Sequence, residues 1–127
     1  MERKLISSGS IYEERYGHSR AVAVGNMVFV AGTVGFNYAE RTVSDDPAEQ
    51  TRQTFRNIEN ALKEAGSSLS DVVSIVTYFT NHDDWDAIGE VLREELQHIR
   101  PGNAGVRVEL IDPKMKVEIS AIAVKSD

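Results

Sequence analysis

The segment from Asp46 to Gly66 constrains the fold most, because it carries the signals of one long amphipathic helix. Asp46 can cap the helix N-terminus, Pro47 suits the first turn, and Glu49 stands three residues after the cap. Gly66 supplies the stop. Between these ends, residues recur at helical spacing and predict a helix over 47–65 with one buried stripe. That stripe consists of Thr51, Phe55, Ile58, Leu62 and Ala65.

A β-hairpin precedes this helix in the predicted structure. Residues 21–24 and 27–32 are two runs rich in β-branched and other apolar residues, and Gly25-Asn26 separates them. Both turn residues tolerate positive φ, so the pattern predicts a tight hairpin. We expect a loop over 33–45. After the helix, residues 72–79 are β-branched and aromatic, which predicts a strand buried on both faces.

The C-terminal half predicts a second helix and two closing strands. The inner stripe of this helix would be Trp85, Ile88, Leu92 and Leu96, and Arg100-Pro101 ends it. Residues 104–111 and 117–124 read as strands joined by a short turn. The expected fold is therefore α+β, a ββαβαβ order with a mainly antiparallel sheet and two helices on one face. Its 127 residues are enough for a single domain, 1–127.

The two closing strands predict that the second face of the sheet is covered by another subunit. Side chains alternate along a strand, so one row of the last strand would face the core: Val117, Ile119, Ala121 and Ala123. The opposite row mixes apolar residues with Glu118, which is unusual for a face in water. On 104–111 we expect the core row to be Ala104, Val106, Val108 and Leu110, with Asn103 and Arg107 opposite. Self-association would cover such a face.

Composition excludes several classes of function. The net charge is −6 and the basic residues are scattered, which disfavours a nucleic-acid partner. The chain has no cysteine, so disulfides, thiolate nucleophiles and Cys-ligated zinc are absent. No signal peptide or membrane span is expected, which favours a cytoplasmic protein without a membrane partner. Asp83-Asp84 begins a helix, where acidic residues complement the dipole, and we predict no metal.

Several segments, in their order and spacing, resemble the RidA/YjgF family. They are the hairpin, Glu-Gln-Thr-Arg-Gln at 49–53, Asn-Ile-Glu at 57–59, Ala-Gly-Ser-Ser-Leu-Ser-Asp-Val-Val at 65–73, Arg-Pro at 100–101 and Val-Glu-Ile-Ser-Ala-Ile-Ala at 117–123. The resemblance runs from about Ser19 to Val124. It implies a chorismate-mutase-like ββαβαβ fold, a homotrimer with sites in clefts between subunits, and hydrolysis of reactive enamines or imines to ketones and ammonia without a cofactor.

The resemblance also implies residues of the site. Glu118 matches the glutamate that positions or activates water, and Gly32 matches a glycine whose backbone N–H groups lie near the substrate. His18 stands in place of a tyrosine, and Ala31 in place of a serine. The second glutamate of the C-terminal motif is Ser120 here.

Two further family positions differ in ways that affect the substrate. Gly89 replaces an asparagine of the second helix, and Asn103 replaces the arginine of a Pro-Ala-Arg-Ser segment that grips the substrate carboxylate. Asparagine has neither the charge nor the bidentate fork of arginine. Together with Gly-Phe-Asn-Tyr-Ala at 35–39, this is similar to a divergent branch of the family with altered specificity.

Several candidates have two interpretations. Arg107 could anchor an anionic substrate, or form a cross-strand or intersubunit ion pair near Glu118. Glu118 could orient water, or pair with Arg107 or Arg20. His18 could transfer protons or lie idle on the surface. Arg20, with Phe36 and Tyr38, would approach the same cleft and suit an anionic or unsaturated substrate, although the aromatic pair could instead pack the loop against a subunit.

These residues lead to two hypotheses of function. The first is a homotrimeric hydrolase of small enamines or imines, in which Glu118 orients water and no cofactor is needed. The second is a ligand-binding or regulatory trimer on the same scaffold without catalytic activity. Replacement of the carboxylate-binding arginine by Asn103 favours the second, whereas Glu118 and Gly32 favour the first.

Overall fold

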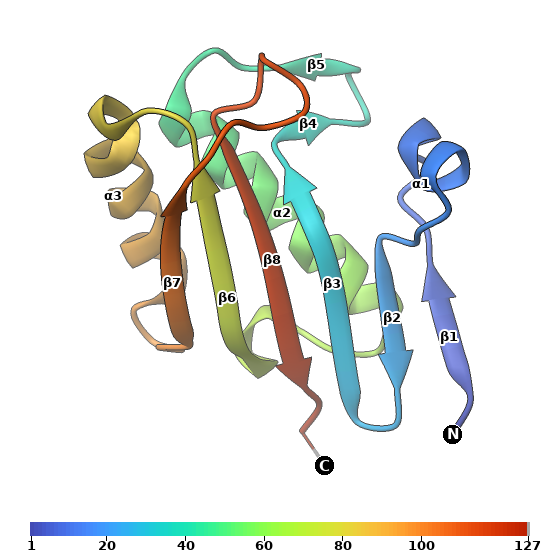
Figure 1. The fold of residues 1–127 in the computed structure, drawn as a ribbon. Helices are drawn as coiled ribbons and strands as arrows, with labels where there is room; N and C mark the ends of the chain where they lie inside the picture. The colour runs from blue at the N-terminus through green and yellow to red at the C-terminus, as the bar shows by residue number, and fades with distance from the viewer. Residues whose placement is uncertain (127) are drawn as a thin grey trace.

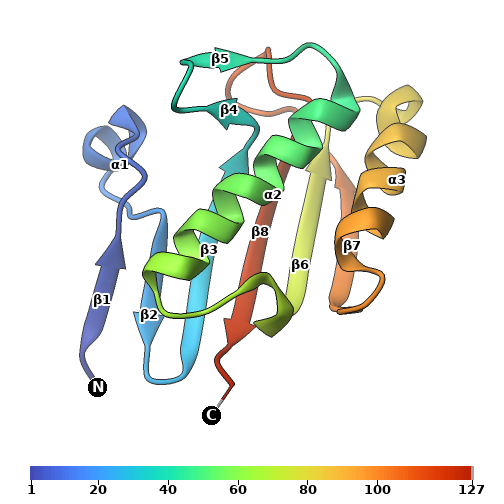
Figure 2. The same cartoon turned by 180° about the vertical axis from the view of Figure 1, so that it is seen from behind.

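The computed structural model describes residues 1–126 and contains one six-stranded sheet with the order β1-β2-β3-β8-β6-β7. Helices α2 and α3 cover one face of this sheet (Figures 1 and 2). Four neighbouring strand pairs are antiparallel and β6–β7 is parallel. The elements are β1 Arg3–Ile6, α1 Ile11–Tyr16, β2 Ala21–Val24, β3 Met27–Val34, β4 Phe36–Asn37, β5 Thr42–Val43, α2 Pro47–Glu64, β6 Val72–Phe79, α3 Trp85–Leu96, β7 Gly102–Arg107 and β8 Val117–Val124.

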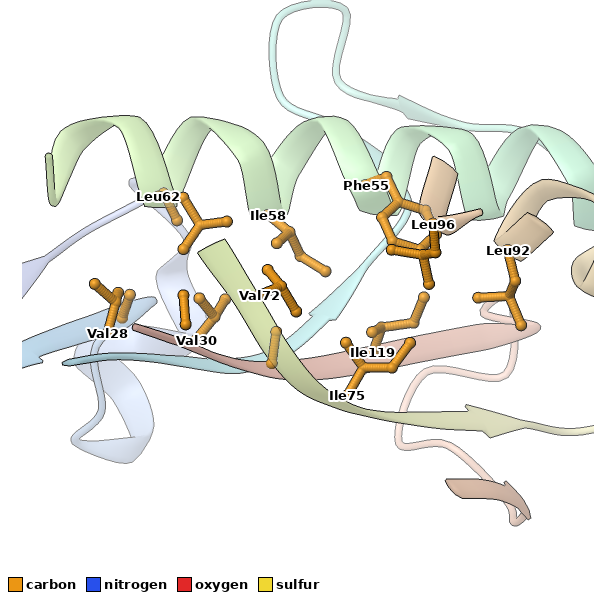
Figure 3. Packing of buried hydrophobic residues seen from close by; sticks show 14 of the residues in the cluster. Val28, Val30, Phe55, Ile58, Leu62, Val72, Ile75, Leu92, Leu96 and Ile119 are labelled. Atoms are coloured by element: carbon orange, nitrogen blue, oxygen red, sulfur yellow. The ribbon is translucent and has the colours of Figure 1, made fainter. Parts of the chain in front are cut away.

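The predicted long helix is confirmed as α2, and it carries the centre of the core. The Asp46 carboxylate accepts a hydrogen bond from the Glu49 backbone N–H at 2.9 Å. Phe55, Ile58 and Leu62 are fully buried against residues of β3, β6 and β8 (Figure 3). Each such side chain stabilises the fold by roughly 1.5–3 kcal/mol. The predicted second helix is confirmed as α3, whose Ile88, Leu92 and Leu96 complete this layer.

The N-terminal half confirms the hairpin and adds elements that the sequence did not predict. Val24 pairs with Met27 across the turn, and Gly25 has a φ of 60°. The expected loop over 33–45 was wrong in part, because β3 runs on to Val34 and the short strands β4 and β5 pair with each other. Strand β1 and helix α1 were not predicted. They are only four and six residues long, too short for a periodic signal.

The predicted arrangement of the closing strands was wrong. Strand β8 lies between β3 and β6, whereas β7 pairs in parallel with β6 at the edge of the sheet. The order from β2 is therefore ββαβαββ, with one more strand than ββαβαβ counts. All six β7 residues are exposed, so Ala104 and Val106 are not core. Nor is β6 buried on both faces, since Val73 is 50% exposed.

A buried amide fixes the top of α2 to two loops. Gln50 Nε2 donates to the carbonyls of Ser44 and Lys114 at 2.8 and 2.9 Å, and its Oε1 accepts from the Lys116 backbone N–H at 2.9 Å. The Gln50 side chain is fully buried and uses both amide groups. At the same place the chain just after β3 passes so close to α2 that a Cβ on Gly35 would overlap the Gln50 backbone carbonyl.

Replacement of Gly35 by alanine should destabilise the chain by about 1–3 kcal/mol, since backbone must move to admit the methyl group. Gly89 provides the control, because a Cβ there meets no atom within 4 Å and the residue lies inside α3. Gly89→Ala should raise the free energy of unfolding by about 0.5–1 kcal/mol. Urea unfolding of both variants measures the difference. Equal stability of Gly35→Ala and wild type would contradict this account of the β3–α2 contact.

Candidate functional site

Glu118 is the second residue of β8 and lies on the face of the sheet that the helices leave open. Its neighbours Val117 and Ile119 are fully buried in the core, so alternation turns the Glu118 side chain the other way. Its cross-strand partners are Val34 of β3 and Tyr78 of β6. The carboxylate is therefore held on a central strand with β3 on one side and β6 on the other, which the sequence did not predict.

A β-bulge brings the backbone of Gly32 against this carboxylate. Val30 pairs with Ala121 and Thr33 with Ile119, so Ala31 and Gly32 together occupy the space opposite one residue of β8. A Cβ built on Gly32 would lie 2.5 Å from Glu118 Oε2 and 2.9 Å from its Cδ. Only glycine leaves room for the carboxylate there. The structure thus brings together three of the predicted site residues: Ala31, Gly32 and Glu118.

Arg20 occupies the other side of the bulge. Strand β2 begins at Ala21, opposite Val30, so on this side β3 has no strand partner beyond Val30. Arg20 fills this place: its Nη1 donates to the Gly32 carbonyl at 2.5 Å and to Thr33 Oγ1 at 3.1 Å. Its Nε lies 3.8 Å from Oε2 of Glu13 in α1. The side chain is 8% exposed, and both of its printed hydrogen bonds come from Nη1.

Burial raises the pKa of the Glu118 carboxyl, and the positive charge of Arg20 opposes part of this rise. A carboxyl whose pKa is raised toward neutral pH is better suited to accept a proton than one at the ordinary value. The arrangement can therefore hold a water molecule and take a proton from it, next to a backbone segment that glycine keeps open.

The structure places His18 near this group but on the surface. It follows Gly17, which ends α1 with a φ of 74°, and it precedes Arg20 by two residues. The His18 backbone N–H donates to the Glu13 carbonyl at 2.9 Å, and the residue is exposed. Its role in proton transfer stays a prediction.

Asn103 and Arg107 do not share a face with Glu118, and this prediction was wrong. Because β7 pairs with β6 and not with β8, its odd-numbered residues face the helices. Asn103 Oδ1 accepts from the hydroxyl of Thr77, a fully buried core residue, at 3.1 Å. Arg107 Nε donates to the Thr80 carbonyl at 3.2 Å and is not diagonal to Glu118.

Within one chain, the predicted residues thus form two separate groups. Glu118, Gly32 and Arg20 lie on or beside β3 and β8, whereas Asn103 and Arg107 lie on β7. Two strand spacings, roughly 10 Å, separate β7 from β8. Gly89 lies on α3, at the β7 end of the sheet (Figure 2).

A cavity on the helix side of the sheet is lined in part by Arg20. It measures about 500 Å³ and lies between α2, the end of β1 and the loop after β4. Tyr38 lines it and packs edge-to-face on Phe36 with ring centroids 5.0 Å apart. Asn57 donates to the Val34 and Phe36 carbonyls and fixes this wall. The two rings therefore contact each other, and their packing against another subunit stays a prediction.

Two absences apply to residues 1–126. No three His, Asp or Glu side chains there are grouped to hold a metal ion. No helix in that range is long and apolar enough to cross a membrane.

Sequence reasoning missed Glu13. It is 7% exposed, although Tyr12 and Tyr16 of the same short helix are exposed. A helix of six residues has no periodicity from which a buried position can be read. The one available signal was that Glu13 stands seven residues before Arg20, a candidate site residue.

Comparison with known proteins agrees with this fold. The profile of the Endoribonuclease L-PSP family matches residues 11–125. A crystal structure of a Mycobacterium tuberculosis member of the YjgF/YER057c/UK114 family is 44% identical, with a TM-score of 0.88 over 97% of this chain and 99% of that one. A RutC family protein of Pyrococcus abyssi is 35% identical over 85% of this chain and 86% of its own length.

An enzyme is among the relatives of similar length. A 2-iminobutanoate/2-iminopropanoate deaminase of Dermatophagoides farinae is 31% identical over 126 residues, which cover 98% of each chain. Fold and sequence together define a YjgF-type α+β protein. The chain belongs to the RidA/YjgF/YER057c/UK114 family, whose profile carries the name Endoribonuclease L-PSP.

Glu118→Gln should stabilise the chain at neutral pH. The pKa of Glu118 is raised above its ordinary value of 4.5, so the folded chain binds this proton more tightly than the unfolded chain. The contribution of Glu118 to the stability of the wild type therefore falls as pH rises from about 4.5 through the pKa that Glu118 has in the folded chain. Urea unfolding of both proteins across this range, at one protein concentration, measures it. We expect the free energy of unfolding of Glu118→Gln to exceed that of the wild type by a margin that grows as pH rises. A margin that does not change with pH would contradict the raised pKa of Glu118.

Proposed function

We propose that the chain hydrolyses small reactive enamines or imines and releases ammonia, with specificity altered from that of the named deaminases. The observation that supports this most is the half-buried Glu118 carboxylate against Gly32, at the positions where the family resemblance expects a water-activating group. Relatives at about 30% identity are named 2-iminobutanoate/2-iminopropanoate deaminases. The proposal transfers the reaction type to this chain and not their substrates.

The proposed chemistry needs one carboxylate and one water. Protonation of the imine nitrogen makes its carbon electrophilic. Glu118 takes a proton from water while the water oxygen bonds to that carbon, which gives a carbinolamine. The nitrogen then receives a proton as the C–N bond breaks, so that ammonia leaves and the remaining hydroxyl becomes the ketone. Glu118 returns its proton within this cycle, and imine plus water balance ketone plus ammonia.

We also propose that the site is completed by a neighbouring subunit of a homotrimer. The strand registers align Leu5, Val22, Phe29 and Ile122 in one row across β1, β2, β3 and β8. This row faces away from the helices, since the neighbouring row of Ala21, Val30 and Ala121 is core. Leu5 is 64% and Phe29 42% exposed in the single chain. A continuous apolar row of this kind is suited to bury against another copy of the chain.

A composite site would also account for the separation of the two groups of predicted residues. Glu118, Gly32, Arg20 and His18 lie toward the β3 side of one chain. Gly89, Asn103 and Arg107 lie toward the β7 edge, and a neighbouring chain would have to supply them. In this arrangement Arg107 can still serve as an anion anchor or as an intersubunit ion-pair partner, and the substrate would be a small anionic or unsaturated molecule.

A second candidate function rests on Asn103. The family resemblance places a carboxylate-binding arginine at this position, and an amide offers no charge for a carboxylate. Here the Asn103 amide oxygen is already engaged by Thr77. A trimer that binds a small ligand without catalysis is the alternative that this favours.

An imine hydrolysis assay separates the two. An amino-acid oxidase would produce iminoacids from neutral, aromatic and acidic amino acids, and semicarbazide would trap those that remain. We expect wild type to accelerate hydrolysis of at least one, and Glu118→Gln to lose about 100-fold or more of the rate. Gly32→Ala, whose methyl group would displace the carboxylate, should lose activity as well.

The control in this assay is Asn103→Arg, which restores the residue that the family resemblance expects. Activity that appears only in Asn103→Arg would mean that simple iminoacids are not the substrates of the wild type. No activity in either protein on the whole panel would favour the ligand-binding alternative.

A further inference from the structure

Helix α1 carries one buried carboxylate, although most of its surface is exposed. Glu13 is 7% exposed and accepts hydrogen bonds from the backbone N–H of Ser8, at 3.1 Å, and from the Ser8 hydroxyl. It also forms an ion pair with Arg20, whose Nε lies 3.8 Å from Glu13 Oε2. Neither Glu13 nor Ser8 takes part in the proposed reaction. Moving two charges out of water costs free energy, so a buried ion pair often adds little to the stability of a fold. The Glu13–Arg20 pair therefore suggests a role other than stabilisation.

We propose that Glu13 is a positioning residue for the site: from α1 it holds the Arg20 guanidinium against the β3 bulge, and so sets the charge and the backbone geometry beside Glu118. This inference rests on the proposed function of Glu118. It adds a residue that lies outside the cleft and acts only through Arg20.

The geometry of the guanidinium carries the argument. Its Nη1 is committed to the Gly32 carbonyl and to Thr33 Oγ1. Its Nε is buried and has no hydrogen-bond partner within 3.5 Å in residues 1–126, so the Glu13 carboxylate is the group that faces it. Contacts at two nitrogens of a planar fork fix the plane of the group. Without Glu13, Nη1 would still bind the bulge, but the guanidinium could rotate about that contact.

The charge of Arg20 therefore acts on both Glu13 and Glu118. Tyr78 of β6 is the cross-strand partner of Glu118. Lys116 lies two residues before Glu118, and its ammonium donates to the Asp45 carbonyl. Arg20 is the one whose charge acts on Glu118. Burial alone would raise the pKa of Glu13, but hydrogen bonds from Ser8 and Ser7 and the Arg20 charge together hold it below the ordinary value. Glu13 is thus an anion at neutral pH.

Removal of the Glu13 charge should make Glu118 easier to ionise. The positive charge of Arg20 would no longer be partly neutralised by Glu13, so it would stabilise ionised Glu118 more strongly. The repulsion between the negative charges of Glu13 and Glu118 would also be removed. Both effects lower the titration midpoint of Glu118. Gln in place of Glu13 can still accept from the Ser8 N–H, so α1 should keep its position.

The test is a carbon-13 NMR titration of Glu118 in the full chain, with the Glu118→Gln spectrum to assign the signal. We expect a lower midpoint in Glu13→Gln than in wild type. The matched control is Glu14→Gln, which removes the same charge from the same helix at an exposed position and should leave the midpoint unchanged. If Glu13 only held α1 in place, unfolding temperature would fall and the midpoint would stay.

A second measurement needs only the wild type. Arg20 Nε–H should exchange slowly with solvent in nitrogen-15 spectra, and its signal should follow the titration of Glu13 at acid pH. Rapid exchange, or no response to acid, would overturn the proposal even if Glu13→Gln did not fold. Neither measurement uses substrate, so it remains valid even if the imine assay shows no activity. An unchanged titration midpoint of Glu118 in Glu13→Gln would refute the role of Glu13 without refuting the proposed function.

Discussion

Strand β8 hydrogen-bonds to β3 on one side and to β6 on the other, and the alternation of its side chains divides the molecule into two faces. Val117, Ile119, Ala121 and Ala123 are buried under α2 and α3. Glu118, Ser120, Ile122 and Val124 must then point away from the helices. A shift of one residue in the β8 register would move Glu118 into the core, so the same pairing that builds the core also positions the candidate site.

The bulge in β3 shapes the candidate site on this face. One extra residue between Val30 and Thr33 places Ala31 and Gly32 opposite Ser120 and lets the Glu118 carboxylate lie against the Gly32 backbone. The Arg20 guanidinium then satisfies the Gly32 carbonyl, which has no β2 residue beside it. Bulge, glycine, arginine and carboxylate depend on one another, and Glu13 connects the group to α1.

The sequence predicted the elements whose signals are long and local. Caps, spacing and stop signals defined both long helices, and Gly25-Asn26 defined the hairpin. It did not predict the place of β7, because a run such as Gly102–Arg107 reads alike in a parallel edge strand and in a hairpin with the next strand. Glu118 and Gly32 were predicted through the family resemblance and do lie together. Asn103 was assigned to the wrong face for the same reason as β7. Glu13 was missed, since its burial depends on Ser8 and Arg20 and not on a pattern.

The central claim is that the open face of the sheet is shared between subunits and forms the site there. Sedimentation equilibrium tests it most directly, with Ile122→Lys as the control, because Ile122 lies on that face and off the core. The account predicts a wild-type mass of three times the 14.1 kDa chain and a folded monomer for Ile122→Lys. A wild type that sediments as a single 14.1 kDa chain at the concentrations of the activity assay would contradict it.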